Sequence, residues 1–369
     1  MEISDFDLQM TCRALNLAAL GTGLVSPNPL VGCVIVSESS EIVGEGTYIY
    51  DNIIHAEAIA LVQAGEKAKG AAAYVSLEPH SHHGKTPPCT DALINSGIKR
   101  VVCPIEDPNP LVSGKGFAQL RAEGIEVTTG ILKAEAEKQN ERFICWHRKK
   151  RPFVHLKLAM SLDGRISLNS SISTALSNEH ALKRVHDLRH EHDAILIGGN
   201  TAFVDSPNLT DRSGKPRRRP LVRVVLDNRL RIPLDSPLIA TANEIPTIVF
   251  TNCDDPKKIA NLSARNVEVI EIDNGGRDLE AVLAELGVRQ IQSILVEGGN
   301  EIAGAFCDAK LVDKLTLMIA PIIIGGRDAP LAIGGNGATI LDDALRLRNV
   351  ELANHGGDIE ITGYPILNV

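Results

Sequence analysis

Four residues near the start of the chain have the types and spacing of a hydrolytic zinc site. His55 is followed two positions later by Glu57, and a loop further on contains His80 and, after eight intervening residues, Cys89. Zinc binds neutral imidazole and thiolate in a tetrahedron, and a catalytic site keeps one position open for a water whose pKa falls to roughly 7. We therefore predict that His55, His80 and Cys89 bind the metal and that Glu57 carries protons.

The local sequence separates these roles. His55 and Glu57 open the segment HAEAIALVQAGEKA, whose small and apolar residues recur with helical spacing before Gly70. Residues at i and i+2 diverge on a helix, so one can face the metal while the other reaches over it toward a substrate. Cys89 opens a second predicted helix, which ends at Gly97. Because a helix N-terminus and a metal both lower the pKa of a thiol, we expect Cys89 to bind as a thiolate.

His80 is the unusual ligand. Zinc deaminases of bases and nucleosides use one His and two Cys, with a Glu two residues after the His, and His80 stands where the first Cys is expected. Imidazole is a good zinc ligand. The same loop could also be a solvated turn, or His82 could replace His80. The other cysteines have apolar neighbours and are expected to fill cores: Cys12, Cys33, Cys103, Cys145, Cys253 and Cys307.

Further motifs resemble a known family. The order Ser26-Pro27-Asn28-Pro29, His-Ala-Glu, SHHGKTPPC and DPNPLVSGKG resembles the RibD family of bifunctional riboflavin biosynthesis proteins, which are fused pyrimidine deaminases and reductases. The resemblance implies a cytidine-deaminase-like α/β/α domain over residues 1–146. It also implies a pocket for a pyrimidine with a phosphoribosyl tail, formed by Asn28, His82, Lys85, Asp107 and Asn109. Lys85 offers a charge for the phosphate, and the amides and carboxylate offer directed hydrogen bonds. Turn chemistry beside proline is an equal explanation for Asn28 and Asn109.

The second half continues the resemblance. LKLAMSLDGRIS, VHDLR, DAILIGGNTAFVDSPNLTDR, VVLDNRLRIP and LVEGGNEIAGAF occur in family order, which implies a dihydrofolate-reductase-like α/β domain over residues 152–369. From the residues alone, Glu297-Gly298-Gly299-Asn300 follows an apolar strand and precedes a helix-like run, a geometry suited to phosphate. Gly198-Gly199 repeats this pattern. Neither is a GxGxxG fingerprint, but two such junctions favour a dinucleotide.

The resemblance also implies NADPH as cofactor and assigns residues to it and to the substrate. Arginines suit the substrate's phosphate, and a carboxylate suits its amino-pyrimidine edge. Lys157 or Asp205 could support protonation, although surface charge or strand-end capping would explain them equally. The cofactor residues are Ala159, Ala175, Thr201, Asp205, Asn228, Gly299, Asn300, Glu301, Ile302, Ala303, Gly304 and Ala305. The substrate residues are Lys157, Ser173, Arg189, Leu209, Arg212 and Glu297.

Each half departs from the family pattern at one position. Relatives carry Lys-Trp-Ile-Thr near the cofactor, where this chain has Thr174-Ala175-Leu176-Ser177. Loss of the stacking Trp removes about 1 to 3 kcal/mol of packing if nothing refills the space. His80 is the other departure. It motivates an alternative in which the chain is only a reductase and its first half is a metal-free or relict module. A third possibility is a deaminase of nucleic-acid bases, and only the pattern of zinc-site residues supports it.

Composition bounds the remaining possibilities. With 369 residues, 44% of them apolar, the chain fits two globular domains of α/β layers with mostly parallel sheets. The net charge of −8 argues against nucleic acid as a partner. No signal-peptide core and no long apolar run occurs, so neither secretion nor a membrane is expected, and seven scattered cysteines suit a reducing cytoplasm. We read the basic stretches 147–151 and 215–219 as solvated linker and loop. A homo-oligomer is expected from the resemblance.

Overall fold

The computed structural model describes residues 4–82 and 87–366, and the chain divides into two compact units. The first comprises residues 1–150 with Pro216–Arg218, and the second comprises residues 151–215 and 219–369. The stretch read as a linker is largely helical, because α6 (Glu141–Lys149) continues through it. Arg151 then forms an ion pair of 2.6 Å with Asp313, so this basic residue is not simply solvated. Among the described residues, no helix is both long and apolar enough to cross a bilayer.

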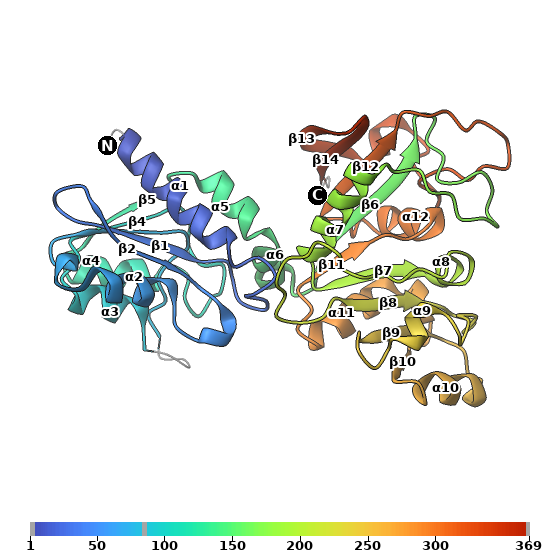
Figure 1. Cartoon of the computed structure of the whole chain (residues 1–369), viewed down its shortest axis with the longest axis horizontal. Coiled ribbons are helices and arrows are strands. Elements are labelled where there is room, and N and C mark those ends of the chain that lie inside the picture. The colour runs from blue at the N-terminus through green and yellow to red at the C-terminus, as the bar shows by residue number, and fades with distance from the viewer. Residues whose placement is uncertain (1–3, 83–86, 367–369) are drawn as a thin grey trace. The chain divides into compact units, whose positions relative to one another are not determined.

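The first unit has three layers, with a five-stranded sheet between helices (Figure 1). Its strands lie in the order β2-β1-β3-β4-β5. Helices α1 and α5 cover one face, and α2, α3 and α4 cover the other. The strands are β1 (Gly32–Val36), β2 (Ile42–Thr47), β3 (Ala72–Val75), β4 (Arg100–Cys103) and β5 (Glu126–Thr129). The helices are α1 (Asp5–Ala19), α2 (Ala56–Ala64), α3 (Cys89–Asn95), α4 (Lys115–Ala122) and α5 (Lys133–Gln139).

The expectation of mostly parallel sheets is wrong for this unit. Strand β1 pairs antiparallel with both β2 and β3, and only β3, β4 and β5 run parallel. The reason is the short connection between β1 and β2, because a tight turn can join only antiparallel neighbours. Two glycines of β2 let α2 pack against the strand backbone. A Cβ on Gly44 would lie 2.0 Å from the carbonyl oxygen of Ala60, and one on Gly46 would lie 2.0 Å from that of Ala56.

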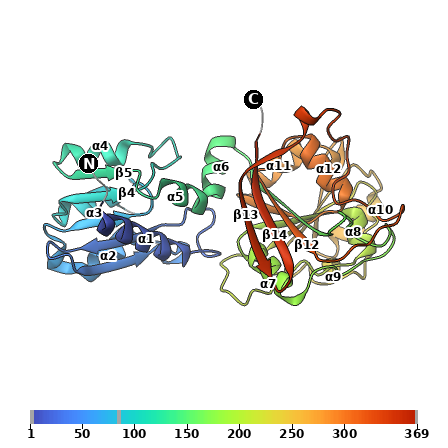
Figure 2. The ribbon, with the colours of Figure 1, turned by 90° about the horizontal axis from the view of Figure 1, so that it is seen from above.

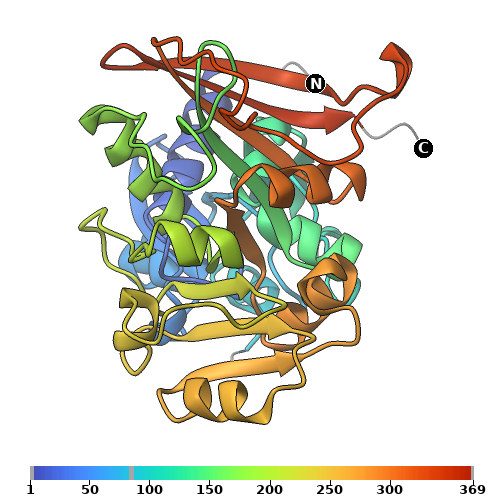
Figure 3. The ribbon, with the colours of Figure 1, turned by 90° about the vertical axis from the view of Figure 1, so that its right-hand side faces the viewer.

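The second unit is built on a nine-stranded sheet in the order β10-β9-β8-β7-β11-β6-β12-β14-β13. Figure 3 shows this sheet twisting from β13 and β14 to β10. In this order the strands from β10 through to β12 run parallel. Strand β14 pairs antiparallel with β12, and β13 pairs antiparallel with β14 at the edge of the sheet (Figure 2). The strands are β6 (Phe153–Ser161), β7 (Ala194–Gly198), β8 (Val222–Leu226), β9 (Thr247–Thr251), β10 (Val267–Glu271), β11 (Ser293–Val296), β12 (Lys314–Ala320), β13 (Arg346–His355) and β14 (Asp358–Ile366).

Alternate residues of these strands point into separate cores. One core lies under α11 and α12, and the opposite cores lie under α8, α9 and α10 and under α7. Since Val224 and Val225 are neighbours in β8 but belong to opposite cores, both faces of the sheet are buried, as expected for a parallel sheet between helices. The helices are α7 (Glu179–His190), α8 (Gly199–Val204), α9 (Pro237–Ala240), α10 (Pro256–Ser263), α11 (Leu279–Val288) and α12 (Asn300–Asp308).

Candidate active sites

The first unit brings the three predicted zinc ligands together. His55 is the N-cap residue of α2, His80 lies in the loop after β3, and Cys89 is the first residue of α3. Their ligand atoms all lie within 4.8 Å of one another. The ring of His82 is 5.5 Å from that of His80, but His82 is exposed and does not belong to this group. The geometry therefore favours His80 over His82 as the third ligand.

Two buried atoms of this site fit a cation. Nε2 of His80 and Oε2 of Glu57 are buried and have no hydrogen-bond partner among the described residues. Burial, with His55 and His82 nearby, lowers the pKa of His80 to about 4, so its imidazole is neutral, as a zinc ligand must be. An unpaired buried nitrogen beside an unpaired buried carboxylate oxygen is costly unless a ligand satisfies both.

The expectation for the cysteines needs two corrections. Burial and the charge of Glu57 raise the pKa of the Cys89 thiol, so the N-terminus of α3 does not by itself produce a thiolate. A bound cation would remove the proton, because coordination stabilises the charged sulfur. Cys12 is exposed on α1 and does not fill a core. Cys33, Cys103 and Cys145 are buried as expected, and Cys253 and Cys307 are half-buried.

A tyrosine that the sequence analysis missed links Asn28 to the metal ligands. The amide nitrogen of Asn28 donates a hydrogen bond of 2.6 Å to the hydroxyl of Tyr48. The Tyr48 ring in turn packs against His55, with 5.3 Å between ring centroids. Only the Tyr48 side chain separates Asn28 from the predicted ligand His55. The Asn28 amide is therefore close enough to the metal site to form hydrogen bonds with a substrate.

The predicted substrate residues of the DPNPLV segment form a turn. The backbone N–H of Asn109 donates to the carboxylate of Asp107 at 2.7 Å, and that of Leu111 donates to Oδ1 of Asn109 at 3.1 Å. Turn chemistry therefore operates here, and it leaves one oxygen of Asp107 and the amide NH₂ of Asn109 for other partners. Burial, together with Glu78, raises the pKa of Asp107 to about 6. Lys85 lies outside the described residues.

The second unit contains a cavity of about 240 Å³ at the carboxyl ends of β6, β7 and β11. The N-terminus of α12 faces it, and Gly299 leaves room for a ligand, because a Cβ there would meet only the Thr201 hydroxyl at 3.7 Å. A backbone exposed at a helix N-terminus suits the phosphates of a dinucleotide. The predicted residues that line the cavity are Lys157, Ala159, Ser173, Thr201, Asp205, Glu297, Gly299 and Asn300.

Three charged side chains meet at one wall of this cavity. Arg189 donates two hydrogen bonds to Glu297, of 2.8 and 3.0 Å, and Nζ of Lys157 lies 3.7 Å from the same carboxylate. Burial alone would raise the pKa of Glu297, but Arg189 and Lys157 lower it to about 2. Burial lowers the pKa of Lys157 against the opposing charge of Glu297. Elsewhere in the cavity lining, burial raises the pKa of Asp205, and a hydrogen bond from Ser173 opposes the shift.

Other predicted residues do not line the cavity. Leu209 is buried in the core under α9, and Arg212 is exposed, although its charge contributes to lowering the pKa of His186. Ala175 is also exposed, next to the lining residue Thr174. Oδ1 of Asn228 accepts a hydrogen bond of 2.7 Å from the backbone of Gly276. That amide therefore supports a loop in this structure.

Most of α12 serves packing. Ala303 belongs to the main core, and a Cβ on Gly304 would lie 2.3 Å from the backbone of Gly334. A helix that starts at a phosphate site can present only its first residues to the ligand, because its later turns rise away from it. Glu301, Ile302, Ala303, Gly304 and Ala305 accordingly do not appear among the residues that line the cavity.

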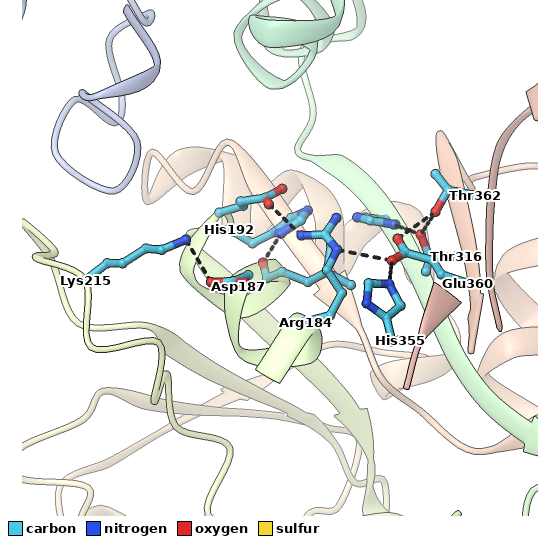
Figure 4. A network of polar contacts seen from close by, with 11 residues as sticks. Arg184, Asp187, His192, Lys215, Thr316, His355, Glu360 and Thr362 are labelled. Carbon is cyan, nitrogen blue, oxygen red and sulfur yellow. Dashed lines mark hydrogen bonds and ion pairs between the residues drawn. The ribbon is translucent and has the colours of Figure 1, made fainter. Parts of the chain in front are cut away.

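A polar network that the sequence analysis missed fixes α7, the helix that carries Arg189. Nε of Arg184 donates to Oε2 of Glu360 at 3.2 Å, and Nε2 of His355 lies 2.6 Å from the same oxygen (Figure 4). The Thr362 hydroxyl donates to the other oxygen at 3.1 Å. At the start of α7, the backbone N–H of Asn178 donates to Asp358. Strand β14 thus holds α7 in place at two points.

Comparisons with known proteins match both parts of the chain. Residues 5–105 match the family "Cytidine and deoxycytidylate deaminase zinc-binding region", and residues 152–361 match "RibD C-terminal domain". The riboflavin biosynthesis protein RibD of Actinobacillus pleuropneumoniae is 42% identical over 96% of this chain and 94% of its own length. That of Escherichia coli strain K12 is 39% identical over 94% and 96%.

Solved structures give the same result over the whole chain. Acinetobacter baumannii RibD matches with a TM-score of 0.87 and 33% identity, covering 98% of this chain and 99% of that one. A diaminohydroxyphosphoribosylaminopyrimidine deaminase/5-amino-6-(5-phosphoribosylamino)uracil reductase from Thermotoga maritima matches with a TM-score of 0.84 and 34% identity, with the same coverage. The likeness extends over both units, the cytidine-deaminase-like one and the reductase one. The chain therefore belongs to the RibD family of bifunctional deaminase–reductases of riboflavin biosynthesis.

Proposed function

We propose that the first unit deaminates 2,5-diamino-6-ribosylamino-4(3H)-pyrimidinone 5′-phosphate and that the second reduces the ribosyl group of the product to ribityl with NADPH. The observation that carries the deaminase assignment is the convergence of the ligand atoms of His55, His80 and Cys89 within 4.8 Å, with the Glu57 carboxylate beside them. Zinc held there would supply the Lewis acidity that activates a water. Glu57 takes a proton from that water and passes protons to the ring nitrogen and to the departing ammonia.

The substrate is held by polar groups around the metal site. Asn28, oriented by Tyr48, and the turn of Asp107 and Asn109 offer hydrogen bonds to the pyrimidine edge. The resemblance assigns His82 and Lys85 to the same pocket, with the charge of Lys85 suited to the phosphate. Release of ammonia from the diaminopyrimidine phosphate by zinc-loaded protein, without NADPH, tests the assignment. A protein that binds no zinc and releases no ammonia, yet reduces, would instead support the reductase-only alternative.

Glu57 is tested by the Glu57→Gln variant. We expect ammonia release to fall by about 10² to 10⁴-fold, because the amide cannot carry the proton. Zinc content and reductase activity should not change, because Glu57 is not among the grouped ligands and lies in the first unit. Retained turnover would remove Glu57 from this role.

In the second unit, the proposed cofactor site is the Gly299 and Asn300 end of α12 with Thr201. Lys157 and Glu297 face the substrate, and Arg189 holds Glu297 from behind the lining. NADPH would supply the hydride that reduces a ribosyl imine carbon. The nitrogen then needs one proton, and Lys157 is the better candidate, since burial lowers its pKa and Glu297 holds it. Lys157→Met should therefore slow reduction more than Asp205→Asn, as measured by NADPH oxidation.

The choice of NADPH over NADH rests on resemblance. Comparison of kcat/KM for NADPH with kcat/KM for NADH tests it, and equal values for the two cofactors would reject the preference. Ala175→Trp tests the missing stacking contact. Because Ala175 is exposed and next to Thr174 at the cavity, a Trp there has space to cover the cofactor, and we expect a lower KM for NADPH.

We further propose a homo-oligomer in the cytoplasm with no nucleic-acid partner. Strands β13 and β14 expose apolar side chains, including Val350 at 50% and Leu352 at 71%. Such a face favours a second copy of the chain. Light scattering on the protein and on Leu352→Lys tests this, and unchanged mass would reject the face as an interface. The net charge of −8 disfavours nucleic acid, and seven scattered cysteines suit a reducing compartment.

A further inference from the structure

Glu78 is a buried carboxylate that the proposed chemistry does not use. It is only 4% exposed. Four backbone N–H groups donate to it: those of Asp107 and Gly114 to Oε2, at 3.1 and 2.9 Å, and those of Gly116 and Phe117 to Oε1, at 2.9 and 3.3 Å. A buried carboxylate is tolerated only when its charge is compensated. Here the compensation comes from backbone dipoles, and both oxygens are used.

All four donors belong to one segment, residues 107–117. Gly116 and Phe117 lie in the first turn of α4, whose N-cap residue Gly114 makes no side-chain cap hydrogen bond. The free N–H groups of a helix N-terminus need such a partner, and negative charge there is favourable. Glu78 supplies both from another part of the chain. At its other end the segment is held through the N–H of Asp107, so one carboxylate closes the whole loop.

The same residue joins this segment to the loop of the metal ligands. Glu78 lies two positions before His80, and its own N–H donates to the carbonyl of Ile105 at 3.2 Å. The two loops are in close van der Waals contact, because a Cβ on Gly116 would lie 2.0 Å from the carbonyl oxygen of Pro79. The start of α4 therefore rests on the backbone immediately before His80.

The buried Cys103 thiol is influenced by carboxylates of both loops. Burial raises its pKa, and the charges of Glu78, Glu57 and Asp107 raise it further, against a hydrogen bond to the carbonyl of Ile105. Cys103 ends β4, the strand that leads into the Asp107 turn.

We propose that Glu78 is a positioning residue of the deaminase, which fixes residues 107–117 against the metal-ligand loop so that Asp107 and Asn109 meet the pyrimidine at a set distance from the metal. The inference rests on the proposed function, because it takes the diaminopyrimidine phosphate as the substrate of this site. Glu78 touches neither substrate nor metal in this proposal and acts through the loop it holds.

The test is a comparison of KM and kcat for ammonia release by zinc-loaded Glu78→Gln protein. The amide keeps one accepting oxygen and turns an NH₂ group toward the remaining N–H donors, so part of the loop is released. We expect KM for the diaminopyrimidine phosphate to rise about tenfold or more, the equivalent of one or two lost buried hydrogen bonds. We expect kcat at saturation, zinc content and NADPH-dependent reduction to stay close to those of the wild type.

Two further variants separate positioning from general damage. Gly116→Ala leaves Glu78 intact but pushes α4 off the Pro79 carbonyl, and it should reproduce the rise in KM. Glu126→Gln makes the same chemical change on an exposed side chain of β5 and should leave KM unchanged. Thermal unfolding of the same preparations, followed by circular dichroism, reports whether the first unit of each variant is folded. If Glu78→Gln does not fold, the Gly116→Ala result decides.

The outcomes are distinct. Unchanged KM in both the Glu78 and Gly116 variants would overturn the proposal. A loss of zinc and of kcat with KM unchanged would also overturn it, because Glu78 would then support the metal ligands alone. Failure of the proposed function itself would appear differently, as a lack of ammonia release from the wild-type protein.

Discussion

The two candidate sites differ in how their charged groups are balanced. At the cavity of the second unit, Lys157 and Arg189 face Glu297, so a buried anion already has its cations. At the metal site, buried atoms of His80 and Glu57 have no hydrogen-bond partner among the described residues. One site is complete as a set of side chains and has a cavity for large ligands. The other needs a small cation to be complete.

We therefore expect the two sites to lose their activities in different ways. A site completed by a metal should lose its activity when the metal is removed and keep its fold, because the helices that carry its ligands are held by their own cores. A site built from three charged side chains that compensate one another, here Lys157, Arg189 and Glu297, should lose its activity when any one of them is neutralised. The remaining buried charges would then have no compensation.

Metal removal should give the largest contrast. After treatment with a strong chelator, we expect ammonia release to be lost completely and NADPH-dependent reduction of the deaminated substrate to continue at its original rate. Parallel assays on one preparation, with zinc measured by atomic absorption, check this. Restoring zinc should restore ammonia release. Equal loss of both activities would show that the second site also depends on the metal.

Neutralising one member of the charged group Lys157, Arg189 and Glu297 should impair reduction and leave deamination intact. In Glu297→Gln, Lys157 and Arg189 lose their shared counterion, and we expect kcat/KM for reduction to fall by about 100-fold or more. Ammonia release should not change. Glu280→Gln, an exposed residue of α11, is the matched control. Comparable losses in the two variants would mean that the charged group has no special role.

The raised pKa of Asp107 predicts a pH-dependent stability in the first unit. Its folded pKa of about 6 lies above the ordinary value of 3.8, so between these pH values the folded protein keeps a proton that the unfolded chain has lost. Stability therefore falls as pH rises through this window, by on the order of 1–3 kcal/mol. Asp107→Asn should lack this fall. Urea unfolding in chelator, at about pH 4 and about pH 7, measures the difference. Parallel pH profiles for the two proteins would contradict the prediction.

The smallest expected effect concerns the unusual ligand. His80→Cys supplies a second thiolate, which is a softer and charged ligand, and we expect zinc to be held about tenfold more tightly. Competition with a coloured chelator measures the affinity. The companion variant His82→Ala should leave the zinc affinity unchanged, because His82 is outside the ligand group. A loss of zinc from His82→Ala alone would make His82 the ligand.

Features set by local sequence could be predicted, and features set by tertiary contacts could not. The helices after His55 and Cys89 follow from nearby residues, and both appear where expected. The pairing of Arg189 with Glu297 spans 108 positions and depends on β11 lying beside both β6 and β7. The sequence motifs named both residues but gave no indication that they pair.

Glu78 shows why some tertiary contacts leave no signal in the sequence. Its partners are backbone N–H groups, which nearly every residue possesses, so no residue type in the segment 107–117 marks them. In the sequence, Glu78 is one carboxylate beside a proline and resembles a turn residue. Tyr48 was missed for a similar reason, because a tyrosine in a strand-like segment indicates packing before it indicates hydrogen bonding to Asn28.

The two glycines of β2 have a consequence for how this protein can vary. Gly44 and Gly46 have no side chain that could react, yet each lies where a methyl group would collide with the backbone of α2, the helix that begins next to His55. Any larger residue would lift that helix and the ligand with it. The positions of β2 should therefore be among the least tolerant of substitution in the chain, and a screen of random variants for ammonia release would find this mutational intolerance on a strand that holds no catalytic group.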